Sequence, residues 1–235
     1  MRSLSSYPNP LLRGWHFAEG VPEPTLWYRL MRRGLYVPMC AAWKVRVFNR
    51  HHEPASGGAL YIANHQSFLD PMLVGMALSR PMDYMARDSL FRTPIFKQLI
   101  ESVNAFPVRR GTADTGAIKE AMRRLKQGRQ IVVFPEGTRT HDAKIGPFLP
   151  GVALLSQRAA EWTVPVLIEG AFEAWPRGRK LPRCGNVTVQ YGPPIHRSEA
   201  RSCDTEQFIH RLRQTLIDMQ KDARRRAGRV ELHYD

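Results

Sequence analysis

The fold is decided by the stretch GALYIANHQSFLDPMLVGMAL, residues 58–78. Its apolar residues 59–63 have the length of a buried strand, and a polar run separates them from a second apolar stretch that begins at Pro71. Proline is favoured at the first position of a helix, and Asp70 in front of it is a residue type that caps helices. The stretch therefore predicts a strand, a polar loop and a helix over residues 71–78.

The same alternation continues along the chain. Short apolar runs predict strands at residues 82–86, 105–108, 130–134, 164–169 and 187–191, and longer runs predict helices at residues 94–103, 114–127, 151–160 and 206–226. Alternating strands and helices indicate an α/β fold, in one domain whose largely parallel or mixed central sheet is flanked by helices. In such sheets, functional residues collect in the loops beyond the carboxyl ends of the strands.

The segment before this alternation has a different character. In residues 25–50, apolar and aromatic residues recur at helical spacing, and basic residues fall among them. This pattern is typical of amphipathic helices that lie in the plane of an anionic lipid surface. Pro38 is expected to kink or divide the segment into two short helices. The alternative is a helix packed on the core with its arginines in water.

The charge of the chain predicts an anionic partner. The formal net charge is +14, and residues 1–50 alone contain eight Lys and Arg against two Asp and Glu. Nucleic acid, anionic lipid and phosphorylated substrates all fit such a balance. Because no nucleic-acid-binding module is recognisable and the charge is concentrated beside interfacial aromatics, we expect a membrane surface and no nucleic acid.

Cysteine usage and hydropathy place the chain on the cytoplasmic side. The three cysteines are widely spaced and form neither a disulfide framework nor a zinc motif, so a reducing cytosol is expected. The longest apolar stretch, residues 34–43, is far shorter than the ~20 residues that span a bilayer. We therefore expect a protein that lies on a membrane without crossing it.

The first candidate site is NHQSFLD, residues 64–70. A neutral imidazole can take a proton from a hydroxyl, and a carboxylate can fix the other ring nitrogen. His65 and Asp70 can pair only if His65 lies in the turn before the helix and Asp70 lies near its start. Taken alone, the pair is weak evidence for catalysis, and the alternatives are a structural loop histidine and a plain helix cap.

Two further loops carry groups that bind anions. FPEGTRT, residues 134–140, follows an apolar strand, and its Gly137 lets the backbone approach a ligand while Thr138 and Arg139 contact a phosphate. Glu136 is expected to hold arginines or a hydroxyl in place. FPVRRGT, residues 106–112, adds two arginines before a glycine. A surface turn and a solvated charge run are the alternatives.

A fourth block, VPVLIEG at residues 164–170, is expected to be structural and to shape the floor of the site or an acyl pocket. Serine-hydrolase, nucleotide-binding and dinucleotide-binding motifs are absent from the sequence, as is a convincing set of metal ligands. The site is therefore expected to work without a metal or cofactor.

Taken in order, NHQSFLD, FPVRRG, FPEGTR and VPVLIEG resemble the four motif blocks of the lysophosphatidic acid acyltransferase family, glycerolipid acyltransferases with an HX4D motif. The resemblance covers about residues 59–195. It implies a glycerol-3-phosphate acyltransferase-like fold. From the resemblance together with the amphipathic patterns on either side of it, three regions are expected: a membrane-associating segment at residues 1–50, a catalytic domain at 51–200, and a C-terminal amphipathic helix and tail of that domain at 201–235.

The resemblance also implies roles for single residues. His65 matches the general base, and Asp70 matches the carboxylate that orients it. The positions associated with the phosphate of the acceptor are matched by Arg139 and Arg110, and Arg87 takes a place where the family often has lysine. Glu136 and Gly137 belong to the acceptor-binding loop. Arg109 departs from the family, which often has aspartate there, and it stays open whether Arg109 or Arg110 faces the phosphate.

The implied reaction moves an acyl group from acyl-CoA or acyl-carrier protein to the 2-hydroxyl of 1-acyl-glycerol 3-phosphate, which yields phosphatidic acid at the cytoplasmic face of the membrane. The same chemistry on a head-group lysophospholipid, a lyso-ornithine lipid or glycerol 3-phosphate is the alternative. Chain length, donor carrier and oligomeric state do not follow from the sequence.

Overall fold

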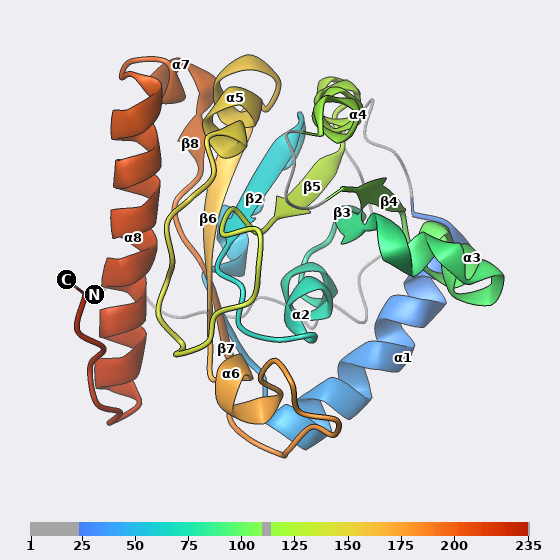
Figure 1. Cartoon of the computed structure of the whole chain (residues 1–235), viewed down its shortest axis with the longest axis vertical. Coiled ribbons are helices and arrows are strands. Elements are labelled where there is room, and N and C mark those ends of the chain that lie inside the picture. Colours follow the sequence, from blue (N-terminus) through green and yellow to red (C-terminus); the bar gives the residue numbers. More distant parts are fainter. Residues whose placement is uncertain (1–23, 110–113, 235) are drawn as a thin grey trace.

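The structure is a computed structural model that describes residues 24–109 and 114–234. Within these residues, eight strands form one sheet (Figure 1). The strands are β1 (Arg46–Phe48), β2 (Ala59–Ala63), β3 (Met82–Arg87), β4 (Ala105–Val108), β5 (Gln130–Val133), β6 (Trp162–Glu169), β7 (Thr188–Tyr191) and β8 (Ile195–His196). They lie in the order β1-β7-β6-β2-β5-β3-β4, and β8 also pairs with β6.

Strand β2 lies at the centre of the sheet. It pairs in parallel with β5 on one side, where Leu60 faces Ile131, and with β6 on the other, where Tyr61 faces Val164. Strands β3 and β4 continue the parallel arrangement, whereas β7 and β8 run antiparallel to β6. The α/β fold with a largely parallel, mixed sheet is thus confirmed. The carboxyl ends of β4, β3, β5, β2 and β6 all lie at one edge.

Helices cover both faces of the sheet (Figure 1). They are α1 (Leu26–Trp43), α2 (Asp70–Met76), α3 (Pro94–Ser102), α4 (Thr115–Lys126), α5 (Gly151–Arg158), α6 (Ala171–Ala174), α7 (Arg197–Ala200) and α8 (Thr205–Arg226), and two short 3-10 helices lie at Arg50–His52 and Asp88–Arg92. Side chains alternate between the faces along β2. Leu60 and Ile62 pack with residues of α4, α5 and α8, whereas Tyr61 and Ala63 pack with α2.

Of the two effects expected of Pro38, the division of the N-terminal segment into two helices is wrong, and the kink stays a prediction. Residues 26–43 form one continuous helix with Pro38 inside it. A proline inside a helix removes one backbone donor, and its ring clashes with the carbonyl one turn before it. Packing compensates, because Tyr28 and Met39 are buried on either side of Pro38, and Arg32 donates to the carbonyl of Leu78 at 2.7 Å. No helix in the described residues has the length and apolar character needed to cross a bilayer.

The helix also ends earlier than the sequence pattern predicts. Lys44 has a φ of 40°, in the left-handed region that terminates helices. The next residues form β1, which pairs in parallel with β7 through Val47 and Val189. Part of the basic N-terminal segment is therefore an edge strand of the sheet.

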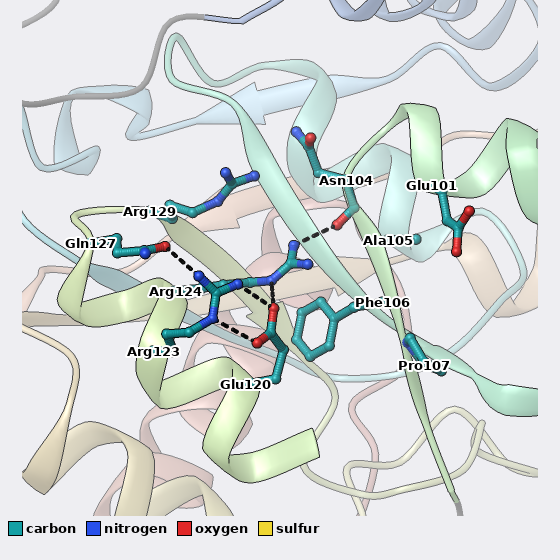
Figure 2. A pocket seen from close by; sticks show the side chains of 10 residues that line it. All are labelled: Glu101, Asn104, Ala105, Phe106, Pro107, Glu120, Arg123, Arg124, Gln127 and Arg129. Carbon is teal, nitrogen blue, oxygen red and sulfur yellow. Dashed lines mark hydrogen bonds and ion pairs between the residues drawn. The ribbon is translucent and has the colours of Figure 1, made fainter. Parts of the chain in front are cut away.

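A surface pocket lies at the amino ends of β4 and β5, opposite the edge that the predicted site occupies (Figure 2). Arginines 123, 124 and 129 line it, and each of them pairs with a carboxylate. Arg124 Nη1 lies 2.9 Å and Arg129 Nη2 lies 2.6 Å from the buried Asp83, and Arg123 pairs with Glu120. Arg124 fastens α4 to β3, and all three arginines have carboxylate partners within the protein, so the pocket is not a candidate for the reaction.

Candidate active site

Two loops meet at the carboxyl edge of the sheet. The histidine loop, residues 64–69, follows β2, and the glutamate loop, residues 134–150, follows the neighbouring β5. They run side by side (Figure 1), and the Thr140 N–H donates to the His65 carbonyl at 2.8 Å. The NHQSFLD and FPEGTRT segments thus meet at this edge.

The histidine and aspartate of the first motif are paired. His65 Nδ1 lies 2.8 Å from Asp70 Oδ2, with His65 5% exposed and Asp70 fully buried. The His65 ring stacks on Phe134, with 4.2 Å between ring centroids and 24° between planes. Because Asp70 holds Nδ1, Nε2 is the ring nitrogen left to act on a substrate.

Asp70 does not cap the helix in the way that its sequence position suggests. It is the first residue of α2, and its Oδ2 accepts hydrogen bonds from the upstream N–H groups of Gln66 at 2.6 Å and Ser67 at 2.7 Å. Burial raises the pKa of Asp70, and the bonds from His65, Ser67 and Gln66 oppose that rise. One carboxylate therefore orients the imidazole and closes the loop that carries it.

Glu136 supports the histidine from the other side. Its Oε1 accepts from the His65 N–H at 2.8 Å, and its Oε2 accepts from the Gly146 N–H at 3.0 Å. Burial raises the pKa of Glu136 to about 7, against these two hydrogen bonds. Its contacts are thus with backbone amides, whereas the sequence suggested an arginine or a hydroxyl as partner.

The sequence analysis missed the next two supports. The Asn64 side chain exchanges two hydrogen bonds with the backbone of Ile168, at 2.7 and 2.9 Å, and so ties the histidine loop to the end of β6. Gln66 Oε1 accepts from the Phe172 N–H at 3.2 Å. Both are buried and polar, and the only sequence signal for them is that polar residues directly follow an apolar strand.

A buried network joins both loops to α8. Gln220 Nε2 donates to Glu169 Oε2 at 2.9 Å and to the Ala143 carbonyl at 3.0 Å. The Tyr234 hydroxyl donates to Gln220 Oε1 and accepts from the Ile145 N–H at 2.9 Å. Ala143 has a φ of 67°, a strained conformation for alanine, which these bonds help to hold. Glu169 of the VPVLIEG block is part of this network, and the role of that block in shaping the floor of the site stays a prediction.

The predicted phosphate-binding residues occupy different positions on this edge. The Arg139 guanidinium carbon lies 3.5 Å from the centroid of the Phe68 ring, beside the histidine. Gly137 has a φ of 69°, which permits the tight turn before Thr138. Arg87 and Arg109 are exposed at the ends of β3 and β4, two and three strands from β2.

Arg110 lies outside the described residues. The choice between Arg109 and Arg110 as the arginine that faces a phosphate therefore stays a prediction. Within the described ranges, no three His, Cys, Asp or Glu side chains are grouped so as to hold a metal ion.

A basic loop completes the site. Residues 175–187, between α6 and β7, contain four Lys and Arg and no Asp or Glu. The Ser67 hydroxyl donates to the Trp175 carbonyl at 2.9 Å, and the Trp175 ring leans on Phe68 at 5.4 Å between centroids. The loop thus covers one side of the histidine loop.

Comparison with known proteins identifies a family whose model matches this sequence. The model of the Acyltransferase family matches residues 44–169, more than half of the chain. The chloroplastic 1-acyl-sn-glycerol-3-phosphate acyltransferase of Arabidopsis thaliana is 29% identical over 162 residues, which cover 67% of this chain and 45% of the plant protein. The 1-acyl-sn-glycerol-3-phosphate acyltransferase of Bacillus subtilis is 27% identical over 173 residues, covering 73% of this chain and 84% of that protein.

The chain spans about half the length of the plant relatives it matches. Among solved structures, the 1-acyl-sn-glycerophosphate (LPA) acyltransferase of Thermotoga maritima superposes with a TM-score of 0.70 at 21% identity, covering 83% of this chain and 79% of that one. This likeness confirms the fold.

Proposed function

The chain belongs to the Acyltransferase family, and from this premise we propose that it acylates the 2-hydroxyl of 1-acyl-glycerol 3-phosphate to give phosphatidic acid. The observation that carries the proposal is the 2.8 Å contact between His65 Nδ1 and the buried Asp70, beside a loop that presents Arg139. A relative from Bacillus subtilis that matches most of this chain has a name that states this activity.

In the proposed mechanism, His65 Nε2 takes the proton of the acceptor hydroxyl while the hydroxyl oxygen attacks the carbonyl carbon of a thioester donor. An ester bond forms, the carbon–sulfur bond breaks, and the thiolate leaves and takes up the proton. Asp70 stabilises the imidazolium that forms in between. The acyl group passes directly to the acceptor, with acyl-CoA or acyl-carrier protein as donor and no cofactor. General-base help of this kind is worth roughly 10²–10⁴-fold.

Binding of the acceptor is assigned to the arginines at the same edge. Arg139 and Thr138 are proposed to hold the phosphate, with Arg109, Arg110 or Arg87 as a second contact. A planar guanidinium recognises a phosphate through two parallel hydrogen bonds, which fixes the position of the attached glycerol. A head-group lysophospholipid, a lyso-ornithine lipid and glycerol 3-phosphate are the alternative acceptors, and the arginines favour an exposed phosphate monoester over the first two.

We place the reaction at an anionic membrane surface, on its cytoplasmic side, with the protein bound peripherally. Leu26, Trp27 and Leu30 on α1 are 50–72% exposed, and Ile95 on α3 is 83% exposed. Trp27 Nε1 donates to Ser102 Oγ at 2.9 Å, so the exposed apolar side chains of the two helices form neighbouring surfaces. Apolar residues beside basic ones suit insertion at the headgroup level. The proposed membrane-contacting surface therefore includes α3 in addition to residues 1–50, which the sequence analysis expected.

A transfer assay tests the proposal. Purified protein on anionic vesicles receives palmitoyl-CoA and 1-acyl-glycerol 3-phosphate, and released thiol and phosphatidic acid are both followed. Wild type is expected to form both, and His65→Ala to form neither. Thiol release without phosphatidic acid would move the assignment to another acceptor. No thiol release with either palmitoyl-CoA or the palmitoyl carrier protein would contradict the proposed reaction.

A further inference from the structure

Arg177, in the basic loop, touches the glutamate loop at the residue before Arg139. Its Nη1 donates to Thr138 Oγ1 at 3.1 Å and lies 3.4 Å from His141 Nε2. Thr138 and Arg177 are 39 positions apart in the chain, so their contact exists only in the folded protein. It brings a second arginine next to the turn that carries Thr138 and Arg139.

The described partners of Arg177 do not include a carboxylate. They are a hydroxyl and an imidazole, and none of the salt bridges among the described residues includes Arg177. The nearby Asp142 carboxylate accepts instead from the Thr140 hydroxyl at 2.9 Å and from the Lys144 N–H at 3.1 Å. An exposed guanidinium whose described partners include no carboxylate keeps donors for an anion.

The loop that carries Arg177 is fixed in place near the catalytic pair. The Trp175 carbonyl accepts from Ser67, which is part of the histidine loop, and Trp175 Nε1 donates to the Arg179 carbonyl at 2.9 Å. Phe68 contacts both the guanidinium of Arg139 and the ring of Trp175. The position of Arg177 is therefore determined by the same contacts that shape the site.

We propose that Arg177 is a second phosphate-binding arginine of the active site, acting with Thr138 and Arg139 on a phosphate group of a substrate. The proposal rests on the proposed function for the identity of the reaction. Two substrates carry phosphate, the glycerol phosphate acceptor and a coenzyme A or phosphopantetheine donor. Since Thr138 and Arg139 are assigned to the acceptor, we expect the acceptor's phosphate to be the ligand.

The test compares Arg177→Gln with Lys180→Gln. Lys180 lies in the same exposed loop and carries the same charge, so the pair separates a direct contact from the general field of the loop. Arg177→Gln is expected to raise the acceptor KM about 10- to 100-fold, the loss expected for hydrogen bonds to a charged group, with little change in kcat. Arg177→Lys should restore part of the loss, and Lys180→Gln should change either KM by less than about twofold.

The outcomes are distinct. A rise confined to the donor KM would keep Arg177 as a phosphate ligand and assign it to the donor. Unchanged values of both KMs, or equal effects of Arg177→Gln and Lys180→Gln, would overturn the proposal. Calorimetric binding of a soluble short-chain lysophosphatidate and of coenzyme A gives the same comparison without turnover. A wild type that binds through Arg177 but forms no phosphatidic acid would contradict the proposed function alone.

Discussion

The two edges of the sheet both carry arginines, and their partners differ. At the amino edge, Arg124 and Arg129 both pair with the buried Asp83. Arg123 pairs with Glu120 (Figure 2). At the carboxyl edge, Arg177 contacts a hydroxyl and an imidazole, and Arg139 lies over an aromatic ring.

The difference separates arginines that pair with carboxylates of the protein from Arg177, for which we propose a ligand. A guanidinium whose charge is balanced by carboxylates of the same protein has little to offer an anion, whereas one without such a partner attracts it. Charge count alone does not make this distinction, because both edges contribute to the same net charge of +14. Substitutions at the two edges should therefore act on different quantities.

The largest difference is expected in turnover. His65→Ala at the carboxyl edge removes the proposed base and should lower kcat about 10²- to 10⁴-fold. Arg123→Ala at the amino edge removes an exposed ion pair and should leave kcat within about twofold. Thiol release from palmitoyl-CoA measures both, and circular dichroism checks the fold. Near-normal turnover of His65→Ala would contradict the assignment of the base.

The next difference concerns the acceptor. Arg139→Gln should raise the acceptor KM about 10- to 100-fold and the donor KM far less, because only the acceptor's phosphate is assigned to Arg139. Arg129→Gln, which removes an arginine from the other edge, should leave both KM values near those of wild type. Initial rates over a matrix of both substrates give the four constants. Equal increases of both KM values in Arg139→Gln would argue against a phosphate contact.

For stability, a substitution at the amino edge should have a larger effect than a substitution at the carboxyl edge. Arg129→Gln leaves the buried Asp83 with one arginine fewer and should lower the free energy of unfolding by about 1–3 kcal/mol. Arg177→Gln, at an exposed position where the described partners include no carboxylate, should change it by less than about 0.5 kcal/mol. Urea unfolding followed by tryptophan fluorescence compares the two. A loss in Arg177→Gln as large as that in Arg129→Gln would show that Arg177 has a structural role.

The smallest expected effect is a pair of opposite pH dependences. Burial raises the pKa of Glu136 to about 7, so its contribution to stability is lost as pH rises from its ordinary value of 4.5 through 7. Arg123 and Arg124 lower the pKa of Glu120 to about 2, so its contribution is lost as pH falls from 4.5 through 2. Each is expected to be about 1 kcal/mol after screening by solvent.

The difference in free energy of unfolding between wild type and each glutamine variant measures these contributions. Relative to Glu136→Gln, wild type should lose stability between pH 4.5 and 7. Relative to Glu120→Gln, it should lose stability between pH 4.5 and 2. The same direction of change for both glutamates would contradict the described environments.

Much of the fold follows from the sequence, because strands buried on both faces appear as continuous apolar runs. The bounds of β2 and β4 are as predicted, and those of β5 and β6 differ by one or two residues. Strand β1 was missed because Arg46–Phe48 is short, basic and adjacent to a helix, and its only support is pairing with β7. The continuous α1 was missed because local rules for Pro38 do not include the tertiary packing around it.

The site, too, could be predicted only where local sequence patterns determine it. The proximity of His65 and Asp70 was expected from a strand, a loop and a helix in immediate succession. The supports from Glu136 and Gln220 depend on which strands and helices become neighbours, and local patterns do not encode this. For Arg177, the sequence shows only that its loop has four basic residues and no acidic one. Nothing in the sequence indicates that Arg177 contacts Thr138.

The position of β2 between β5 and β6 also affects the order of events during folding. The bond from the His65 N–H spans 71 residues to Glu136, and the bond between Asn64 and Ile168 spans 104. Closing such long loops is slow, since their entropy is lost before the contacts form. During refolding, the helices should therefore form well before the histidine loop is fixed, and recovery of activity should lag behind recovery of helical circular dichroism.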